Sequence, residues 1–284
     1  MFASIELGRR IEAAEARMMT AFAEVAQAAA PRGTVLLEQI GGGVAVLVQR
    51  ASPMNKAIGL GFDGPLDEGR LAAIETAWHE RGASLQVELA TLARCEVAQQ
   101  LAARGYELRA FENVLGCAPA SLRPAAPAAF AVEDAEELDR GAFVDCMVDS
   151  FLHGDGSGAG SADEFARADL VAAMSESMSM PGMRRYAVRI DGAIAGGASM
   201  HVDPQGVAQL CGAATAPRFR RRGIQAALLR SRLADAARDG CDVAVITTQP
   251  GSKSQANAQR QGFSLLYARA ILVKPPRNLG ERRD

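Results

Sequence analysis

The sequence predicts an α/β protein that consists of two similar domains in tandem, each with a twisted mixed sheet flanked by helices. Two kinds of segment alternate along the chain. In one kind every second residue is apolar, which is typical of strands, and in the other the apolar residues have helical periodicity. A length of 284 residues is comfortable for two domains of average size. The third observation is a set of landmark residues that recurs at one constant spacing.

This spacing is 157 residues and it links the two halves of the chain. It pairs Gly105-Tyr106 with Gly262-Phe263, Leu115 with Leu272, and Leu71 with Leu228. In each pair the two members stand at the same place in the expected order of helices and strands. We interpret the halves as two diverged copies of one α/β domain.

The first copy is expected at residues 1–117. Residues 5–28 carry apolar side chains at helical spacing and stop before Pro31-Arg32-Gly33, and Gly41-Gly42-Gly43 indicates a hairpin turn. The expected helices are 5–28, 67–81 and 95–104. The expected strands are 35–40, 44–50, 58–62, 84–89 and 106–116.

A linker and the second copy follow. Residues 118–129 are rich in Ala and Pro, which favours a linker, and they leave 130–284 for the second domain. A Gly/Ser-rich loop is expected at 154–160. The expected helices are 136–151, 163–177, 223–238 and 254–261. The expected strands are 186–191, 193–202, 209–215, 243–248 and 263–273.

The composition narrows the class of protein. A net charge of −2 gives no overall attraction to nucleic acid or to an anionic membrane. The five cysteines show no CxxC spacing, which argues against a zinc site and a disulfide framework. The amphipathic N-terminus does not read as a signal peptide, and no apolar stretch is long enough to cross a bilayer. We expect a cytoplasmic protein without a metal; a homodimer is one assembly that the sequence leaves open.

A basic loop stands between the strand 209–215 and the long helix 223–238. Arginine occupies four of the five positions 218–222, and Gly223 follows. The N–H groups and the dipole at a helix N-terminus attract anions, and glycine lets an anion approach the backbone. The loop therefore predicts a site for a diphosphate such as that of coenzyme A. A solvated basic turn and an RNA-binding patch are the alternatives.

The segment from Arg220 to Gln225, Arg-Arg-Arg-Gly-Ile-Gln, resembles the (Arg/Gln)-x-x-Gly-x-(Gly/Ala) signature of the GNAT acetyltransferase superfamily. The later stretch Gln249–Asn257, followed by Gln261-Gly262-Phe263, is similar to the helix and turn that close the cofactor site of that family. The resemblance covers roughly residues 130–275. It implies two GNAT-like domains, of which the second binds acetyl-CoA.

The resemblance also implies roles for particular residues. The pyrophosphate would take backbone amides from Arg221 to Ala226, and the pantetheine arm would lie between the strands 209–215 and 243–248. Asn257 would hold the pantetheine region, and an acceptor amine would attack the thioester directly. The residues expected at the cofactor are Ala214, Thr215, Ala216, Arg220, Arg221, Arg222, Gly223, Ile224, Gln225, Ala226, Ser252, Ser254 and Asn257.

Three positions depart from the family pattern. Gln225 stands where Gly or Ala is usual, Ala258 stands where a tyrosine acid is common, and the strand 209–215 carries no carboxylate base. Proton transfer would then fall to other groups or to water. Candidates for the acid are Tyr267, Ser252 and Ser254, and candidates for the base are His153, Asp155, Glu176 and His201.

The first copy lacks the features of the basic loop. At the constant spacing, Asp63-Gly64-Pro65 stands opposite the three arginines, and Leu66 stands opposite Gly223. A pyrophosphate would be repelled by the acid and would find no N–H on the proline. It would also meet a leucine side chain where glycine would let it approach the backbone. We expect a degenerate copy that binds no coenzyme.

The leading hypothesis is an N-acetyltransferase that acts on the primary amine of a small molecule or a peptide. A catalytically silent acyl-CoA-binding sensor or regulatory module is the alternative, because the usual acid and base are missing. An RNA-associated protein is disfavoured by the nearly neutral net charge.

Overall fold

The computed structural model describes residues 1–121, 130–154 and 165–276, and these form two compact units. The N unit comprises Ile5–Phe111 together with the chain from Arg269 onward, and the C unit comprises Glu112–Ala268 together with Met1–Ser4. Most of the expected linker, 122–129, lies outside the described residues. The expected domain limits stay a prediction. The units themselves divide within two strands, near residues 111 and 268.

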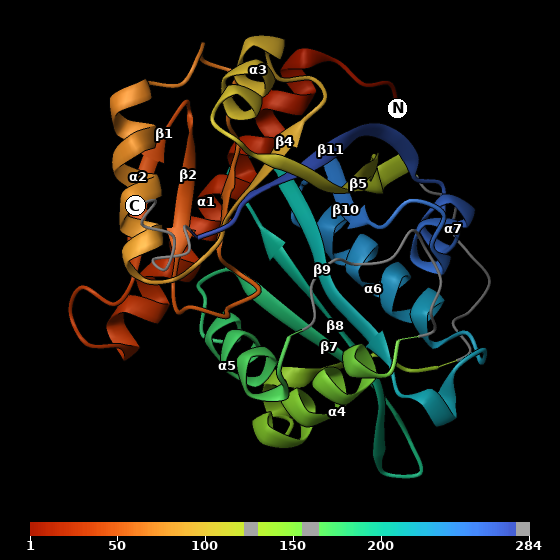
Figure 1. Ribbon diagram of the computed structural model, residues 1–284. Coiled ribbons are helices and arrows are strands. Elements are labelled where there is room, and N and C mark those ends of the chain that lie inside the picture. Colours follow the sequence, from red (N-terminus) through yellow and green to blue (C-terminus); the bar gives the residue numbers. More distant parts are fainter. Residues whose placement is uncertain (122–129, 155–164, 277–284) are drawn as a thin grey trace. The chain divides into compact units, whose positions relative to one another are not determined.

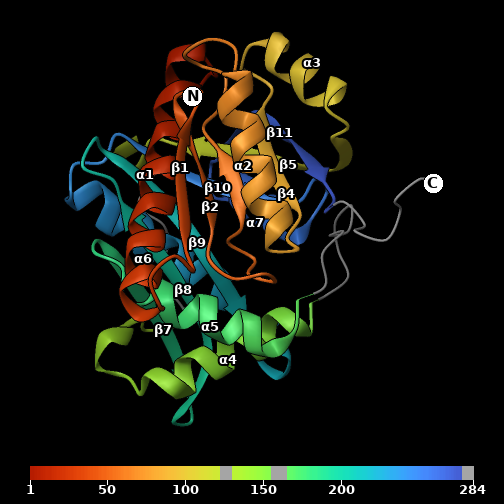
Figure 2. The same ribbon diagram turned by 60° about the vertical axis from the view of Figure 1, so that its left-hand side comes forward.

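The N unit is a five-stranded sheet with helices on both faces (Figure 2). Its strand order is β1-β2-β3-β4-β11, in which only β3 and β4 are parallel. Ala45 and Leu47 of β2 belong to the core under α2 and α3, while α1 also packs on β2. The helices are α1 (Ile5–Ala29), α2 (Glu68–Glu80) and α3 (Cys95–Ala103). The strands are β1 (Leu36–Ile40), β2 (Gly43–Leu47), β3 (Lys56–Ile58), β4 (Leu85–Ala90) and β11 (Ser264–Lys274).

The C unit has the strand order β5-β10-β9-β8-β7-β6, and β9 and β10 are its parallel pair. Val188 of β7 faces the core with α6, and its neighbour Ala187 faces the core with α4 and α5, so helices cover both faces (Figure 1). The helices are α4 (Arg140–Leu152), α5 (Arg167–Ser177), α6 (Ile224–Arg238) and α7 (Lys253–Arg260). The strands are β5 (Glu107–Cys117), β6 (Glu133–Asp134), β7 (Met183–Ile190), β8 (Ala193–Val202), β9 (Val207–Thr215) and β10 (Val243–Thr248).

Each unit contains a strand from the other half of the sequence. Residues 113–117 of β5 pair with β10 in the C unit, and residues 269–274 of β11 pair with β4 in the N unit. The sequence places β5 and β11 at the ends of the first and second copies. The spatial order therefore differs from the sequence order, because a strand pattern does not specify which neighbour the strand pairs with.

The element order confirms the α/β fold and its mixed, helix-flanked sheets. The spacing of 157 residues relates the strands 107–117 and 264–274 residue by residue, and α3 and α7 agree to within one residue at their starts. The two copies share a succession of two antiparallel pairings and one parallel pairing, β1-β2-β3-β4 in the first and β7-β8-β9-β10 in the second. They also share two helices, α2 and α3 in the first and α6 and α7 in the second. The expected strand 58–62 is wrong in its limits, since β3 ends at Ile58 and a glycine with positive φ follows at Gly59. None of the described helices is long and apolar enough to span a membrane.

Candidate functional site

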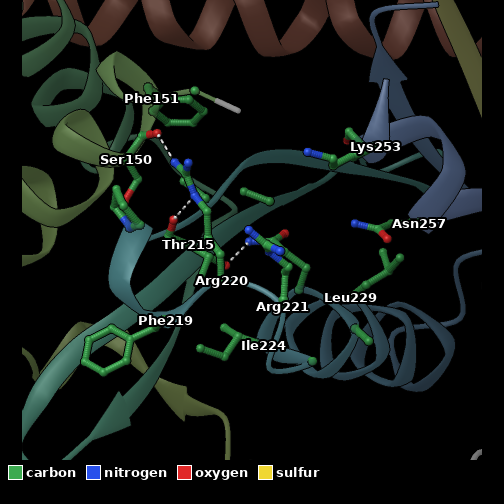
Figure 3. A pocket seen from close by; sticks show the side chains of 18 of the residues that line it. Ser150, Phe151, Thr215, Phe219, Arg220, Arg221, Ile224, Leu229, Lys253 and Asn257 are labelled. Carbon is green, nitrogen blue, oxygen red and sulfur yellow. Dashed lines mark hydrogen bonds between the residues drawn. The ribbon is translucent and has the colours of Figure 1, made fainter. Parts of the chain in front are cut away.

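A cavity of about 1030 Å³ lies in the C unit, between the end of α4, strands β9 and β10, and helices α6 and α7 (Figure 3). Backbone and side chains of both polar and apolar residues line it. They are Ser150, Phe151, Gly154, Ala213, Ala214, Thr215, Pro217, Phe219, Arg220, Arg221, Gly223, Ile224, Gln225, Ala226, Leu229, Arg232, Ile246, Lys253, Ser254, Asn257 and Arg260.

The two parallel strands create this opening. β9 and β10 pair only over Val207–Gln209 and Val243–Val245, near the start of each strand. The later residues Ala213, Ala214 and Ile246 line the cavity instead. The pairing of β8 with β9 shifts register between Gly197 and Ser199, and Gly212 of β9 has a φ of +54° beside this irregularity. Such bulges bend a strand away from its neighbour.

The loop after β9 exposes backbone amides to the cavity. Arg221 has a φ of +62° and Gly223 a φ of +92°, so left-handed residues alternate with ordinary ones before α6 begins at Ile224. Alternating backbone of this kind turns N–H groups toward one side, where an anion binds. In the described part of the chain no side chain caps the N-terminus of α6, and a Cβ on Gly223 would meet no atom within 4 Å. The amides and the helix dipole are therefore available to an anionic ligand.

The arginines of the loop differ in what they contact. The Arg220 guanidinium donates to the carbonyl of Thr215 at 3.2 Å and to that of Ser150 at 3.3 Å (Figure 3). It also donates to the carbonyl of His153. It thus clamps the loop to the carbonyl end of α4, where a cation is favourable. Arg218 and Arg222 lie over the ring of Phe219, at 4.7 and 5.5 Å from its centre. Arg221 also lines the cavity. Among the described residues it makes neither the carbonyl contacts of Arg220 nor a contact with the ring of Phe219.

Most of the expected cofactor residues meet at this cavity. Ala214, Thr215, Arg220, Arg221, Gly223, Ile224, Gln225, Ala226, Ser254 and Asn257 line it, whereas Ala216, Arg222 and Ser252 do not. Ser252 is the N-cap of α7 and accepts from the amide of Gln255 at 3.1 Å. The side chain of Gln225 donates to Thr215 Oγ1 at 2.7 Å, so it folds against β9 and leaves the loop amides uncovered.

The side chain of Asn257 faces the cavity beside Lys253 on α7 (Figure 3). Its Oδ1 accepts a hydrogen bond from Arg260, one turn away. Lys253, Arg260 and Phe151 also line the cavity and are not among the expected cofactor residues. Lys253 and Arg260 follow the helical spacing that brings Asn257 to the cavity, and this spacing is the signal that could have found them.

The candidates for proton transfer mostly lie elsewhere. Tyr267 is buried in β11, and His153 ends α4 with its Nδ1 2.8 Å from the carbonyl of Asp149. Burial lowers the pKa of His201 and raises the pKa of Glu176. Among the candidates that the structure describes, Ser254 alone lines the cavity. Asp155 lies outside the described residues.

Arg232 of α6 is a lining residue that the sequence analysis missed. Only 1% of its surface is exposed, and burial lowers its pKa to about 10, so it stays cationic at neutral pH. Ile224, Leu228 and Arg232 recur every four residues on the buried side of α6. An arginine at an apolar position of a helix could have drawn attention to it.

Within the residues that the structure describes, no group of three or more His, Cys, Asp and Glu side chains could hold a metal ion. None of the five cysteines, all of which lie within the described residues, forms a disulfide. Cys211 of β9 is partly buried beside Arg232.

Residues 158–263 match the model of the acetyltransferase (GNAT) family. No curated protein matches the sequence.

Several solved structures share the fold at low sequence identity. A GCN5-related N-acetyltransferase from Kribbella flavida is 18% identical, with a TM-score of 0.64 over 92% of this chain and 95% of its own. A tandem GNAT protein from the clavulanic acid biosynthesis pathway is 13% identical, with a TM-score of 0.57 over 90% and 87%. A GCN5-related N-acetyltransferase from Sphaerobacter thermophilus is 16% identical, with a TM-score of 0.54 over 74% and 68%. The chain therefore has the fold of these proteins, and its residues 158–263 match the model of the GNAT acetyltransferase family.

Proposed function

We propose that the chain is an N-acetyltransferase that moves the acetyl group of acetyl-CoA to a primary amine of a small molecule or a peptide in the cytoplasm. The observation that carries this proposal is the uncapped N-terminus of α6 at the mouth of a cavity that continues between β9 and β10. A diphosphate fits converging amides, and an extended chain fits the edges of two diverging strands, whose unpaired backbone groups can bond to it.

Different lining residues would bind different parts of acetyl-CoA. The amides from Arg221 to Ala226 would bind the diphosphate, with Arg221 adding positive charge. Ala213, Ala214 and Ile246 would border the pantetheine arm, and Asn257 would bond to one of its amides. Small side chains on β9 suit this role because they leave the backbone accessible.

The reaction would proceed by direct attack. The nitrogen of a neutral amine would bond to the thioester carbonyl carbon, the C–S bond would break, and the proton of the amine would pass to water. Ser254 is the one candidate hydroxyl among the described residues that lines the cavity. A positioned base contributes a factor of about 10²–10⁴, so an enzyme that relies on water should work best at alkaline pH, where more amine is neutral.

The N unit would act as a copy that binds no coenzyme. Its loop between β3 and α2 carries Asp63, Pro65 and Leu66 where the C unit has arginines and Gly223. It would support the fold and the binding of the acceptor.

A catalytically silent acyl-CoA-binding module is the second candidate. Its support is the lack of a carboxylate, histidine or tyrosine among the residues that line the described cavity. Binding would be kept and turnover absent.

Thermal unfolding with acetyl-CoA tests the binding. A ligand at about a hundred times its dissociation constant stabilises the folded state by about 2.7 kcal/mol. We therefore expect acetyl-CoA to raise the melting temperature by an amount that corresponds to this free energy. No shift at high acetyl-CoA would refute both candidates. Release of free thiol in a screen of primary amines then separates them: turnover supports the enzyme, and binding without turnover across the screen supports the silent module.

A further inference from the structure

The guanidinium of Arg232 is a buried positive charge, and the described residues in contact with it offer only carbonyl oxygens. Its Nε donates to the carbonyl of Leu228 at 3.2 Å, and its Nη1 donates to those of Ser199 at 3.0 Å and Cys211 at 3.4 Å. Among the residues that the structure describes, no carboxylate contacts it and no acceptor meets Nη2. Burial of an ion without a counter-ion costs several kcal/mol, so its presence needs a reason.

The corresponding position of the N unit shows how the chain normally treats such a charge. Glu75 of α2 stands 157 residues before Arg232. It is also buried, and it is paired with Arg104 at 2.7 Å and Lys274 at 2.8 Å. The first copy thus balances this buried charge with its own side chains. In the second copy, no carboxylate among the described residues balances the charge of Arg232.

Arg232 lies deep along the cavity. It follows Ile224 by eight residues on α6, about 12 Å along the helix axis from the loop that exposes its amides. It bonds to Cys211 of β9, just before the residues Ala213 and Ala214 that line the cavity. A ligand with its diphosphate at the loop would bring its far end toward this guanidinium.

We propose that Arg232 stabilises the negative charge that collects on the coenzyme A sulfur as the thioester is cleaved. The inference rests on the proposed function. When the amine nitrogen bonds to the carbonyl carbon, the electron pair of the C–S bond stays on sulfur and forms a thiolate, while the amine proton goes to water. Arg232 keeps its own proton and supplies a fixed charge and Nη2 as a donor. A preoriented cation in a site of low dielectric is an effective form of such stabilisation.

This role fits the absence of an acid at Ala258, because a stabilised thiolate leaves without being protonated. The titratable groups that face Arg232 are Cys211 of β9 and Tyr186 of β7. Tyr186 donates to Asp235 at 2.8 Å, and burial raises the pKa of its hydroxyl. Tyr186 therefore stays neutral between pH 6.5 and 9.0, the range of the experiment that follows. The other charges at the cavity, Arg220, Arg221, Lys253 and Arg260, are cationic.

Binding of coenzyme A and of desulfo-coenzyme A, in which hydrogen replaces the thiol, tests the inference between pH 6.5 and 9.0. A free thiol has a pKa near 8.5, and a nearby cation lowers it by about one to three units. For a lowering of one to two units, the affinity of the wild-type protein for coenzyme A should rise roughly 7- to 40-fold over this range relative to desulfo-coenzyme A. The phosphates and Cys211 affect both ligands equally, so the ratio isolates the sulfur.

Arg232→Gln should abolish this rise while desulfo-coenzyme A still binds, which also shows that the variant is folded. Arg230→Gln removes an arginine of the same helix that does not line the cavity, and it should keep the rise. Arg232→Lys keeps the positive charge but loses the planar guanidinium, and it should retain part of the rise. It replaces Arg232→Gln as the test variant if Arg232→Gln does not fold. A flat ratio in the wild-type protein, or a rise that persists in Arg232→Gln, would overturn the inference alone. If neither ligand binds, the proposed function fails as well.

Discussion

The loops that precede α2 and α6 occupy the same place in the two copies but use their backbone groups in opposite ways. In the C unit the loop amides face a cavity and α6 has no side-chain cap in the described structure. In the N unit Asp67 caps α2 by accepting from the amide of Arg70 at 2.7 Å. The amide of Leu66 donates to Gln100 Oε1 at 2.9 Å, and the Gln100 side chain donates back to the Leu66 carbonyl at 3.1 Å.

The two loops differ in whether side chains occupy the backbone groups at the helix N-terminus, and the candidate anion site lies where no described side chain does so. A helix cap contributes about 1 kcal/mol to stability, and the C unit forgoes it at α6. Gln100 and Asn257 stand 157 residues apart and show the same contrast. Gln100 fills the loop of its own copy, whereas the shorter Asn257 faces the cavity.

The largest expected effect comes from a negative charge at the exposed amides. Gly223→Asp should weaken acetyl-CoA binding by about 100-fold or more, because like charges 4 Å apart repel by about 4 kcal/mol at an effective dielectric of 20. Isothermal titration calorimetry measures the loss. Gly240→Asp is the matched control, since Gly240 follows the other end of α6, has a φ of +77° and also has open space for a Cβ. Equal affinity in the two variants would show that the loop does not hold the diphosphate.

The sequence predicted the elements well because each is specified locally. Apolar spacing and the glycines at 105 and 262 indicated α3, α7, β5 and β11 to within one or two residues. The exchange of β5 and β11 between the units could not be read, because strand pairing depends on distant residues.

The sequence predicted which backbone segments meet at the candidate site, but it predicted fewer of the side-chain contacts there. The loop, its glycine and its helix meet at the cavity as expected. The contacts of Arg220 with Ser150 and His153 join residues about 70 positions apart, and no local pattern encodes them. Arg232 was missed because an arginine in an amphipathic helix normally lies in water.

A second expected effect concerns the buried charges of the N unit. Arg269 of β11 bonds to Glu12 at 2.8 Å and also to Glu15, and Lys56 lies 3.0 Å from Glu15. Burial acts to raise the pKa of Glu15, but the attraction of Arg269 and Lys56 outweighs it and lowers this pKa to about 2. A carboxyl with a lower pKa in the folded state stabilises the fold above its unfolded pKa, and this contribution is lost as the pH falls toward 2.

We therefore expect the N unit to lose on the order of 3 kcal/mol between about pH 5 and pH 2 through this carboxyl. Trp78 is the single tryptophan and is fully buried in the N unit, so its fluorescence during urea unfolding reports on this unit. Glu15→Gln should remove most of the pH dependence in this window. Glu24→Gln changes an exposed residue of the same helix and should leave it unchanged. A pH dependence that survives in Glu15→Gln would assign the acid sensitivity to other carboxyls.

The smallest expected effect tests whether the loop of the N unit is closed by Gln100. Gln100→Ala leaves the amide and the carbonyl of Leu66 without these partners and should lower the free energy of unfolding by about 1–3 kcal/mol, followed again by Trp78. Gln99→Ala, at an exposed neighbour on α3, should change it little. Acetyl-CoA should still bind at one site per chain, because the loop keeps Asp63, Pro65 and Leu66 where the C unit has arginines and Gly223. A second equivalent of bound acetyl-CoA would instead mean that Gln100 alone separates the closed loop from the open one.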